Sequence, residues 1–471
     1  MSAAAAPTPH SPADEARALV RLALPIAIAQ AGQALMGFVD TVVVGRAGTS
    51  ALAAVGLANM LFFAVSGFGI GMMAGLDPLI SQAFGARTPG RARALLWQGG
   101  YLAVALGLLL AVPILLAPAL LPLFGVRPAE LSQVHSYLLL RAPSLPLVFL
   151  YFSTRSYLQA AALTRPLVVA TVVANLFNLG ADILLVFGGA GLPAWTGPLR
   201  LIPALGASGA AIATTLGCIL QWALVALAVR YVPAPEQESG RPRRALHLPD
   251  LRQAVRVGLP IGLHIGAEIG VFALAGLLSA RFGPASVSAH QIAISFASLT
   301  FTVAMGIGNA GSVRVGWAVG AHDTAQARQS GFVAFAAGAG FMSLSALFFA
   351  LFPEPLARAA GAPPDVLRLA APLLVVSAVF QISDGIQGVG AGVLRGAGEA
   401  HFTFLANMVG HYAIGLPVAL LLGFWLGQGV VGIWWGLCVG LTAVALALVW
   451  RFNRISAGII RPLGSESSEG S

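Results

Sequence analysis

Residues 22–44 read LALPIAIAQAGQALMGFVDTVVV, and this stretch decides the fold. It contains a single charged side chain, Asp40, and about 20 apolar residues are enough for a helix to cross the hydrocarbon core of a bilayer. The run is too long for the core of a signal peptide and lacks a clear cleavage site. We therefore expect it to be a retained first transmembrane helix.

The rest of the chain repeats this pattern. Of its 471 residues 9% are charged and 58% hydrophobic, and the mean hydropathy is +0.85, whereas ordinary soluble domains carry about 25% charged residues. This composition excludes a soluble globule and predicts an all-α integral membrane protein with twelve transmembrane helices. The expected spans are 20–45, 52–80, 95–122, 134–159, 166–188, 205–230, 255–280, 286–318, 330–353, 367–394, 402–426 and 430–451.

The basic residues indicate the orientation. The net charge is +9 and all 26 basic residues are arginines, but none forms a dense patch with interleaved aromatics, so we expect no nucleic-acid partner. With a cytoplasmic N-terminus, 19 arginines fall on the inner side, as the positive-inside rule requires. We expect a multi-pass protein of the inner (plasma) membrane with both termini cytoplasmic. The outer side keeps Arg46, Arg127, Arg141, Arg200, Arg281, Arg358 and Arg368.

The two halves of the chain resemble each other. Leu24-Pro25-Ile26 recurs as Leu259-Pro260-Ile261, an offset of 235 residues (260 minus 25), and residues 83–86 (AFGA) meet residues 318–321 (AVGA) at the same offset. Six spans per half give a parallel repeat, which is typical of transporters with a site at the interface of the halves. The expected parts are an N-terminal tail 1–19, an N-lobe 20–232, a Pro- and Arg-rich cytoplasmic linker 233–250, a C-lobe 251–453 and a C-terminal tail 454–471.

Several acidic residues lie inside predicted spans, where each costs at least about 2.5–3.5 kcal/mol and is a functional candidate by default. Asp40 has no basic residue within one helical turn, and Asn178 and Asp182 share one helical face. Carboxylate and amide oxygens suit protons and hard cations. We expect a coupling-ion site at Asp40, Asn178 and Asp182, with Na+ as a possible metal; the alternative is a structural polar contact between helices.

A second acidic set lies in the other half. Glu268 has His264 one turn before it, and Asp384 lies in a polar run that includes Gln387. We expect Glu268 and Asp384 to take part in cation coupling or substrate binding, and His264, Gln387 and Met36 to line a cavity.

Other sequence features argue against a disulfide, a phosphate-binding loop and a catalytic or metal site. Asp77, near the inner end of its span, favours an ion pair or a helix cap. Cys218 and Cys438 each stand alone in an apolar stretch, which favours buried free thiols over a disulfide. Gly-rich stretches such as 67–71 and 388–398 lack the Lys-Ser/Thr ending of a phosphate loop and favour close helix packing or hinging. We found no nucleophile elbow, Walker sequence or metal-ligand cluster, so we expect no enzyme and no cofactor, and energy from an ion gradient of H+ or Na+.

These motifs resemble the multidrug and toxic compound extrusion (MATE) family. The similarity runs through all twelve spans. The segments that carry it are residues 40–45 (DTVVVG) leading to 52–56 (LAAVG), 81–86 (SQAFGA), 288–293 (SAHQIA), 314–316 (RVG) and 392–396 (GVLRG).

The resemblance implies a cation-coupled antiporter built as a V-shaped pair of six-helix bundles that exports cationic, amphipathic compounds by alternating access. We expect a monomer in the lipid bilayer, although the sequence leaves the oligomeric state open. It implies an N-lobe cation site at Asp40, Asn178 and Asp182, most like the DinF-type branch, and C-lobe acids like those of the NorM-type branch, so this chain carries both sets. Met36 stands one turn before Asp40, and Phe380 replaces the aromatic hydroxyl usual one turn before the span-ten acid. Each change removes a possible oxygen ligand, so H+ remains as plausible a coupling ion as Na+.

Three other functions compete with antiport. A flippase for an amphipathic lipid-linked precursor belongs to the same superfamily, but it would favour a cationic central cavity, whereas the charges within these spans are acidic. A membrane-embedded transferase would need a loop with clustered catalytic acids or histidines. A receptor or scaffold would have no use for five costly intramembrane acids.

Overall fold

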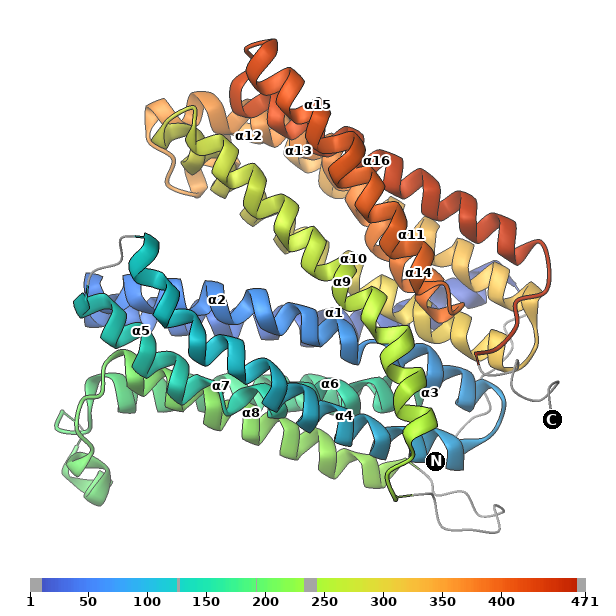
Figure 1. The fold of residues 1–471 in the computed structure, drawn as a ribbon, viewed down its shortest axis with the longest axis horizontal. Coiled ribbons are helices and arrows are strands. Elements are labelled where there is room, and N and C mark those ends of the chain that lie inside the picture. Colours follow the sequence, from blue (N-terminus) through green and yellow to red (C-terminus); the bar gives the residue numbers. More distant parts are fainter. Residues whose placement is uncertain (1–10, 125–127, 192, 233–243, 464–471) are drawn as a thin grey trace. The chain divides into compact units, whose positions relative to one another are not determined.

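The computed structural model describes residues 11–124, 128–191, 193–232 and 244–463, and Figure 1 shows its helices. These residues form helices and loops, with no strand among them. The first half contains α1 (Pro12–Ala47), α2 (Thr49–Met73), α3 (Leu76–Gly85), α4 (Pro89–Leu116), η1 (Ala117–Phe124), α5 (Pro128–Arg141), α6 (Ser144–Ala160), α7 (Arg165–Phe187), η2 (Ala194–Leu201), α8 (Ala207–Ala228) and η3 (Val229–Tyr231). The second half contains α9 (Leu248–Ala280), α10 (Pro284–Gly320), α11 (Thr324–Leu351), α12 (Pro353–Ala359), α13 (Pro364–Gly396), α14 (Ala400–Asn407), η4 (Met408–Gly415), α15 (Leu416–Leu420), η5 (Leu421–Trp425) and α16 (Gly429–Ser456).

The predicted all-α membrane architecture is confirmed. In the described part of the chain, eleven helices are long and apolar enough to cross a membrane, and a bent pair, residues 131–141 and 144–160, makes a twelfth. The expected unbroken span 134–159 is therefore wrong in detail, because its two parts meet at an angle of 42°. Pro143 lies at this break and has no N–H to continue the helix. The Ser144 hydroxyl donates to the carbonyl of Arg141 (2.7 Å), which satisfies an acceptor at the break.

By contacts the chain divides into two compact units. Among the described residues, unit 1 contains those within 29–76 and 93–255, and unit 2 contains residues 11–28, 77–92 and 256–463. The first part of α1 and all of α3 after Leu76 thus belong to unit 2. The predicted lobe boundaries stay a prediction, since residues 233–243 of the linker, with Arg241 and Arg243, lie outside the described residues, as do Arg127, residues 1–10 and residues 464–471.

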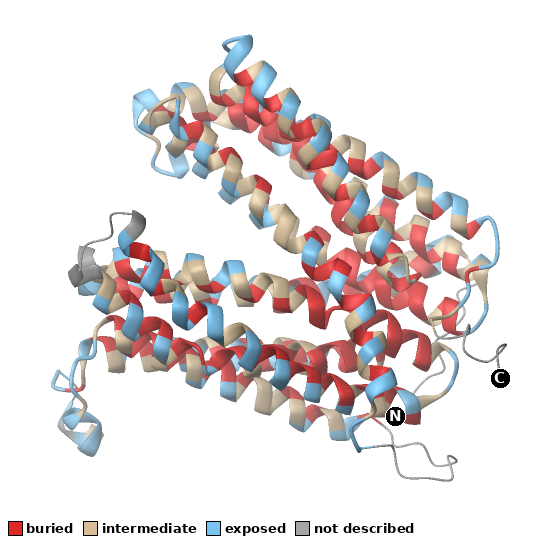
Figure 2. Ribbon diagram, viewed as in Figure 1, coloured by how far each residue is buried: buried red, intermediate tan, exposed pale blue. Residues whose placement is uncertain are grey.

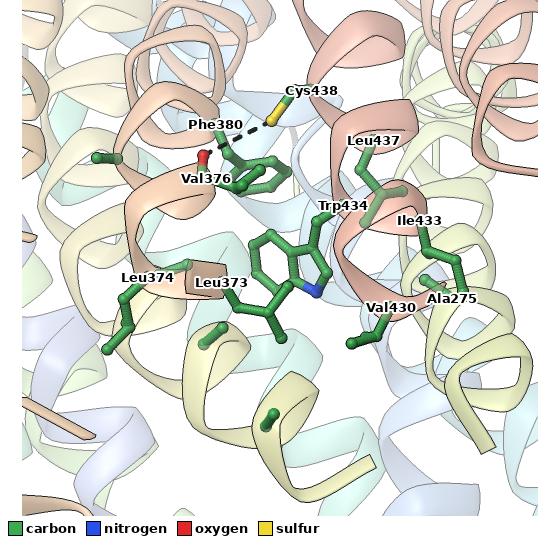
Figure 3. Packing of buried hydrophobic residues seen from close by; sticks show 14 of the residues in the cluster. Ala275, Leu373, Leu374, Val376, Phe380, Val430, Ile433, Trp434, Leu437 and Cys438 are labelled. Atoms are coloured by element: carbon green, nitrogen blue, oxygen red, sulfur yellow. Dashed lines mark hydrogen bonds between the residues drawn. The ribbon is translucent and has the colours of Figure 1, made fainter. Parts of the chain in front are cut away.

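Unit 2 has two inner helices, α13 and α16. Half of the most apolar window of α13 and 61% of that of α16 are buried, against 28–39% for the other single-helix spans, and Figure 2 shows their buried residues in red. Trp434 is fully buried; its indole N–H donates to Nδ1 of His290 (3.2 Å) and its ring lies 5.4 Å from that of Phe380. Figure 3 shows Trp434 beside Phe380, and the Cys438 thiol directed at the carbonyl of Val376.

Glycines bring the helices of unit 2 into backbone contact. A Cβ added to Gly392 of α13 would lie 2.2 Å from the carbonyl oxygen of Gly308 on α10, and one on Gly396 would lie 2.4 Å from that of Ser312. A Cβ on Gly436 of α16 would lie 2.3 Å from Cα of Ala419. Because lipid offers no hydrophobic drive for helix association, such close packing supplies the attraction. The predicted packing role of the glycines in 388–398 is confirmed at these contacts.

Candidate functional site

Unit 1 gathers the first set of predicted residues between α1, α7 and α8. Asp40 is 2% exposed, and its Oδ2 accepts a hydrogen bond from the Thr214 hydroxyl of α8 (2.8 Å). Asn178 and Asp182 of α7 are fully buried, and the carboxyl groups of Asp182 and Asp40 interact. The structure thus brings Asp40 and Asp182 together from helices more than a hundred residues apart in the sequence.

We call Asp40, Asn178 and Asp182 the acidic cluster. Most of its side-chain oxygens receive no hydrogen bond. Oδ1 of Asp40, both carboxyl oxygens of Asp182 and both amide atoms of Asn178 are buried and find no hydrogen-bond partner among the described residues. A buried polar atom without a partner costs about 1–3 kcal/mol. Protons or a hard monovalent cation such as Na+ would satisfy these oxygens, so the donor set fits the predicted coupling ion.

Met36 and Gly217 close one side of the acidic cluster. A Cβ on Gly217 would lie 3.5 Å from Cβ of Asn178 and 3.9 Å from Cε of Met36. Met36 is 5% exposed, so it packs beside the cluster; its role as a cavity-lining residue stays a prediction. Met36 carries no oxygen that could contact Asp40. The Thr214 hydroxyl contacts Asp40 instead, and this partner was not predicted from the sequence.

Unit 2 gathers the second set of predicted residues. His264 Nε2 lies 3.6 Å from Glu268 Oε2 on α9 and 3.2 Å from Nε2 of Gln387 on α13. Gln387 also donates to the side chain of Asn407 on α14 (3.2 Å). Asp384 is 4% exposed and interacts with Glu268. The predicted residues of this half therefore lie in one cluster, with Asn407 as a member that the sequence did not reveal.

His411 is a second residue that the sequence analysis missed. It is 2% exposed, lies in the π-helical segment η4, and neither ring nitrogen has a hydrogen-bond partner among the described residues. It interacts with His264 and its ring centre lies 6.4 Å from that of Phe272 on α9. π-helical segments occur often at functional sites, and a histidine within an apolar span was the signal available in the sequence.

Two neighbouring residues of α13, Gln381 and Phe380, have structural partners instead. Gln381 accepts hydrogen bonds from the hydroxyls of Thr300 (2.6 Å) and Ser345 (2.8 Å). Phe380 packs between Phe272 and Trp434 in the core. Only the Asp384 and Gln387 positions of this run thus belong to the cluster with Glu268.

Several charged groups at helix ends are paired within unit 2. Asp77 lies 3.5 Å from Arg395, which confirms the expected ion pair and identifies its partner. Glu15 is fully buried, although the sequence placed it in a tail, and it accepts two hydrogen bonds from Arg314, one of 2.7 Å from Nε. Gln326 adds a third bond to the Glu15 carboxylate (2.8 Å). Cys218 and Cys438 are buried and free, as predicted.

The MatE family model matches two segments of the chain, residues 25–184 and 260–421. The chain belongs to the MatE family. The two matched segments begin 235 residues apart (260 minus 25), which is the offset of the repeat found in the sequence. This MatE protein is therefore built from two related halves, as predicted.

Relatives of this MatE protein are multidrug resistance proteins by name. It is 34% identical to "Multidrug resistance protein NorM" of Burkholderia vietnamiensis, covering 93% of this chain and 94% of the relative. It is 36% identical to "Probable multidrug resistance protein NorM" of Rhodopseudomonas palustris, covering 92% and 91%. The resemblance to the DinF-type branch at Asp182 stays a prediction.

Solved structures share the fold. The eukaryotic MATE transporter AtDTX14 superposes with a TM-score of 0.80 at 20% identity, covering 95% of this chain and 98% of that one. The bent form of the Vibrio cholerae MATE transporter VcmN gives a TM-score of 0.80 at 22% identity, with the same coverage. The twelve-span architecture of this MatE protein is thus the MATE fold.

Proposed function

We propose that this MatE protein is a cation-coupled antiporter that exports cationic, amphipathic compounds by alternating access, without chemical conversion of its substrate. Its relatives are multidrug resistance proteins, and the observation that carries the coupling is the acidic cluster of unit 1. Asp40 and Asp182 are buried beside each other, and three of their four carboxyl oxygens receive no donor from the described residues. The coupling ion is H+ or Na+.

The mechanism follows from the cost of two adjacent buried carboxylates. Each ionised group is expensive inside the membrane, and the two repel each other. Binding of a proton or Na+ removes part of this cost, so it stabilises whichever conformation holds the ion best. A cationic substrate competes for the same negative charge and favours the opposite conformation. The exchange of ion for substrate is antiport.

Glu268 and Asp384 extend the proposal to unit 2. They form a second acidic pair, in which Asp384 is buried and Glu268 is half-buried. His264 lies in hydrogen-bonding range of Gln387 and close to Glu268. We assign this cluster to substrate or ion binding in the same cycle. Glu268→Gln and Asp384→Asn would each lower coupled efflux if unit 2 takes part in coupling.

The test is ethidium efflux from proteoliposomes that carry a pH gradient alone, a Na+ gradient alone, or neither. Wild type is expected to follow one of the gradients, and Asp40→Asn, which keeps the shape but not the charge, is expected to lose gradient-driven efflux. Glu354→Gln is the matched control, since Glu354 is exposed and its ion pair among the described residues is with Arg358, one turn away. Undiminished efflux by Asp40→Asn would sink the assignment.

The same assay addresses the flippase. The relatives named above are multidrug transporters, which gives the flippase no support. Wild-type protein that ignores both gradients but moves a fluorescent lipid-linked amphiphile between leaflets would replace antiport by flipping.

A further inference from the structure

Arg141 lies inside unit 1, although the sequence counts it with the outer arginines. It is the last residue of α5 at the 42° bend of the fourth span, and it is 9% exposed. Its guanidinium carbon lies 4.7 Å from the centre of the Phe62 ring on α2. Nε and Nη1 are buried without an acceptor among the described residues. A guanidinium cannot shed its proton in a protein, so a full positive charge is buried here.

Helix α8 places this charge next to the acidic cluster. The Thr214 hydroxyl donates to Asp40 (2.8 Å), and the hydroxyl of the next residue, Thr215, donates to the carbonyl of Leu140 (3.1 Å), immediately before Arg141. Two consecutive residues thus hold Asp40 on one side and the end of α5 on the other. The guanidinium interacts electrostatically with Asp40 and with Asp182, but it forms no direct ion pair with either in the described structure.

The charges of Asp40, Asp182 and Arg141 determine how many cations the acidic cluster can balance. Two ionised carboxylates carry −2 and Arg141 carries +1, so the group as a whole carries −1. Buried charges are retained at high cost only when they are balanced, and one further monovalent cation completes the balance. Without Arg141 the same carboxylates would attract a cation more strongly and leave room for a second one.

We propose that Arg141 is the internal counter-cation of the acidic cluster and limits that cluster to one monovalent cation. The inference rests on the proposed function, because it takes the acidic cluster to be the coupling-ion site. Arg141 acts through the carboxylates and is therefore a positioning residue. It sets the affinity of the acidic cluster for cations and the number of cations that the cluster binds. Because Arg141 forms no direct ion pair with Asp40 or Asp182 in the described structure, their carboxyl oxygens stay available to the exchanged ion.

A second buried arginine of the same bent span provides the matched control. Arg155 of α6 is 6% exposed and lies 4.4 Å from the centre of the Phe152 ring, with its Nε also lacking a partner among the described residues. It resembles Arg141 in burial and in its aromatic contact, but no described carboxylate pairs with it. A merely structural role of a buried arginine would thus affect both variants alike.

The experiment measures equilibrium binding of radioactive 22Na+ to purified, full-length protein at alkaline pH. Arg141→Gln is expected to bind Na+ at least about tenfold more tightly than wild type, because a unit charge at close range changes ionic equilibria by about that factor or more. Arg141→Lys, which keeps the charge, and Arg155→Gln are expected to stay within about threefold of wild type. The double variant Arg141→Gln/Asp182→Asn again carries −1 and is expected to return toward the wild-type value.

Equal Na+ binding by wild type and Arg141→Gln, including binding too weak to detect in both, would overturn the inference. If Arg141→Gln does not fold, the charge-balanced double variant is expected to recover a monodisperse protein, and its failure to do so would also overturn it. Failure of the proposed function would appear elsewhere, as undiminished efflux by Asp40→Asn, so the two failures are distinguishable.

Discussion

Replacing Gly392 by alanine tests the close packing of α13 on α10. The added Cβ would lie 2.2 Å from the carbonyl oxygen, 2.5 Å from the carbonyl carbon and 2.9 Å from Cα of Gly308. Ordinary van der Waals contact begins at 3.4 Å, so the helices must separate by about 1.2 Å (3.4 minus 2.2). All three atoms are backbone, so no side chain can rotate away.

Overpacking of this kind costs about 1–3 kcal/mol. For a chain of 471 residues we expect this as a fall of about 1–3 °C in the apparent melting temperature in detergent. The shift would also loosen the bond from Arg395 of α13 to Asn309 of α10 (2.5 Å). Gly340→Ala is the control, because Gly340 of α11 is exposed and a Cβ there would meet nothing within 4 Å; it is expected to stabilise slightly, by about 0.5–1 kcal/mol. Equal melting of both variants would refute the packing argument.

Three further substitutions test buried polar contacts. Glu15→Gln leaves the charge of Arg314 buried without its counter-ion and is expected to cost about 3–5 kcal/mol of stability, seen by thermal melting. Gln387→Leu removes the bridge between His264 and Asn407 and is expected to cost about 1–3 kcal/mol by the same measurement. Thr214→Val removes the hydroxyl that holds the site carboxylate and is expected to slow gradient-driven ethidium efflux about tenfold or more, since hydrogen bonds to charged groups are worth about 1.5–3 kcal/mol.

Each of these substitutions has a control. Glu354→Gln breaks an exposed pair and is expected to change stability by less than about 1 kcal/mol. If Glu15→Gln and Glu354→Gln lost similar stability, burial would not explain the cost of Glu15→Gln. Thr214→Ser keeps the hydroxyl and is expected to retain efflux, so a loss as large as that of Thr214→Val would point to packing instead. Melting of Gln387→Leu at the wild-type temperature would show that the bridge contributes nothing.

Hydropathy predicts the spans well because lipid forces every backbone polar group to be satisfied within a helix. It does not locate the break at Pro143, since the apolar run continues through it. The carbonyls at the bend are satisfied by the local bond from Ser144 and by the tertiary bond from Thr215. Nor does it predict the π-helical segment η4, which brings His411 into the interior of unit 2.

The candidate acids could be found from the sequence because a charge within an apolar span is conspicuous. Their partners could not, since Thr214 reaches Asp40 across 174 residues and a threonine within a span is ordinary. Arg141 was hidden for another reason: counting arginines by side of the membrane assigns it to a surface, whereas the bent span places it in the interior.

The most direct test of antiport reverses the driving force. Proteoliposomes are loaded with ethidium and diluted into ethidium-free buffer, with no ion gradient imposed, while lumenal pH and 22Na+ uptake are recorded. Outward movement of ethidium is expected to draw H+ or Na+ inward, giving lumenal acidification or Na+ accumulation that Asp40→Asn abolishes. Ethidium leaving through the wild-type protein with neither ion entering would contradict cation-coupled exchange.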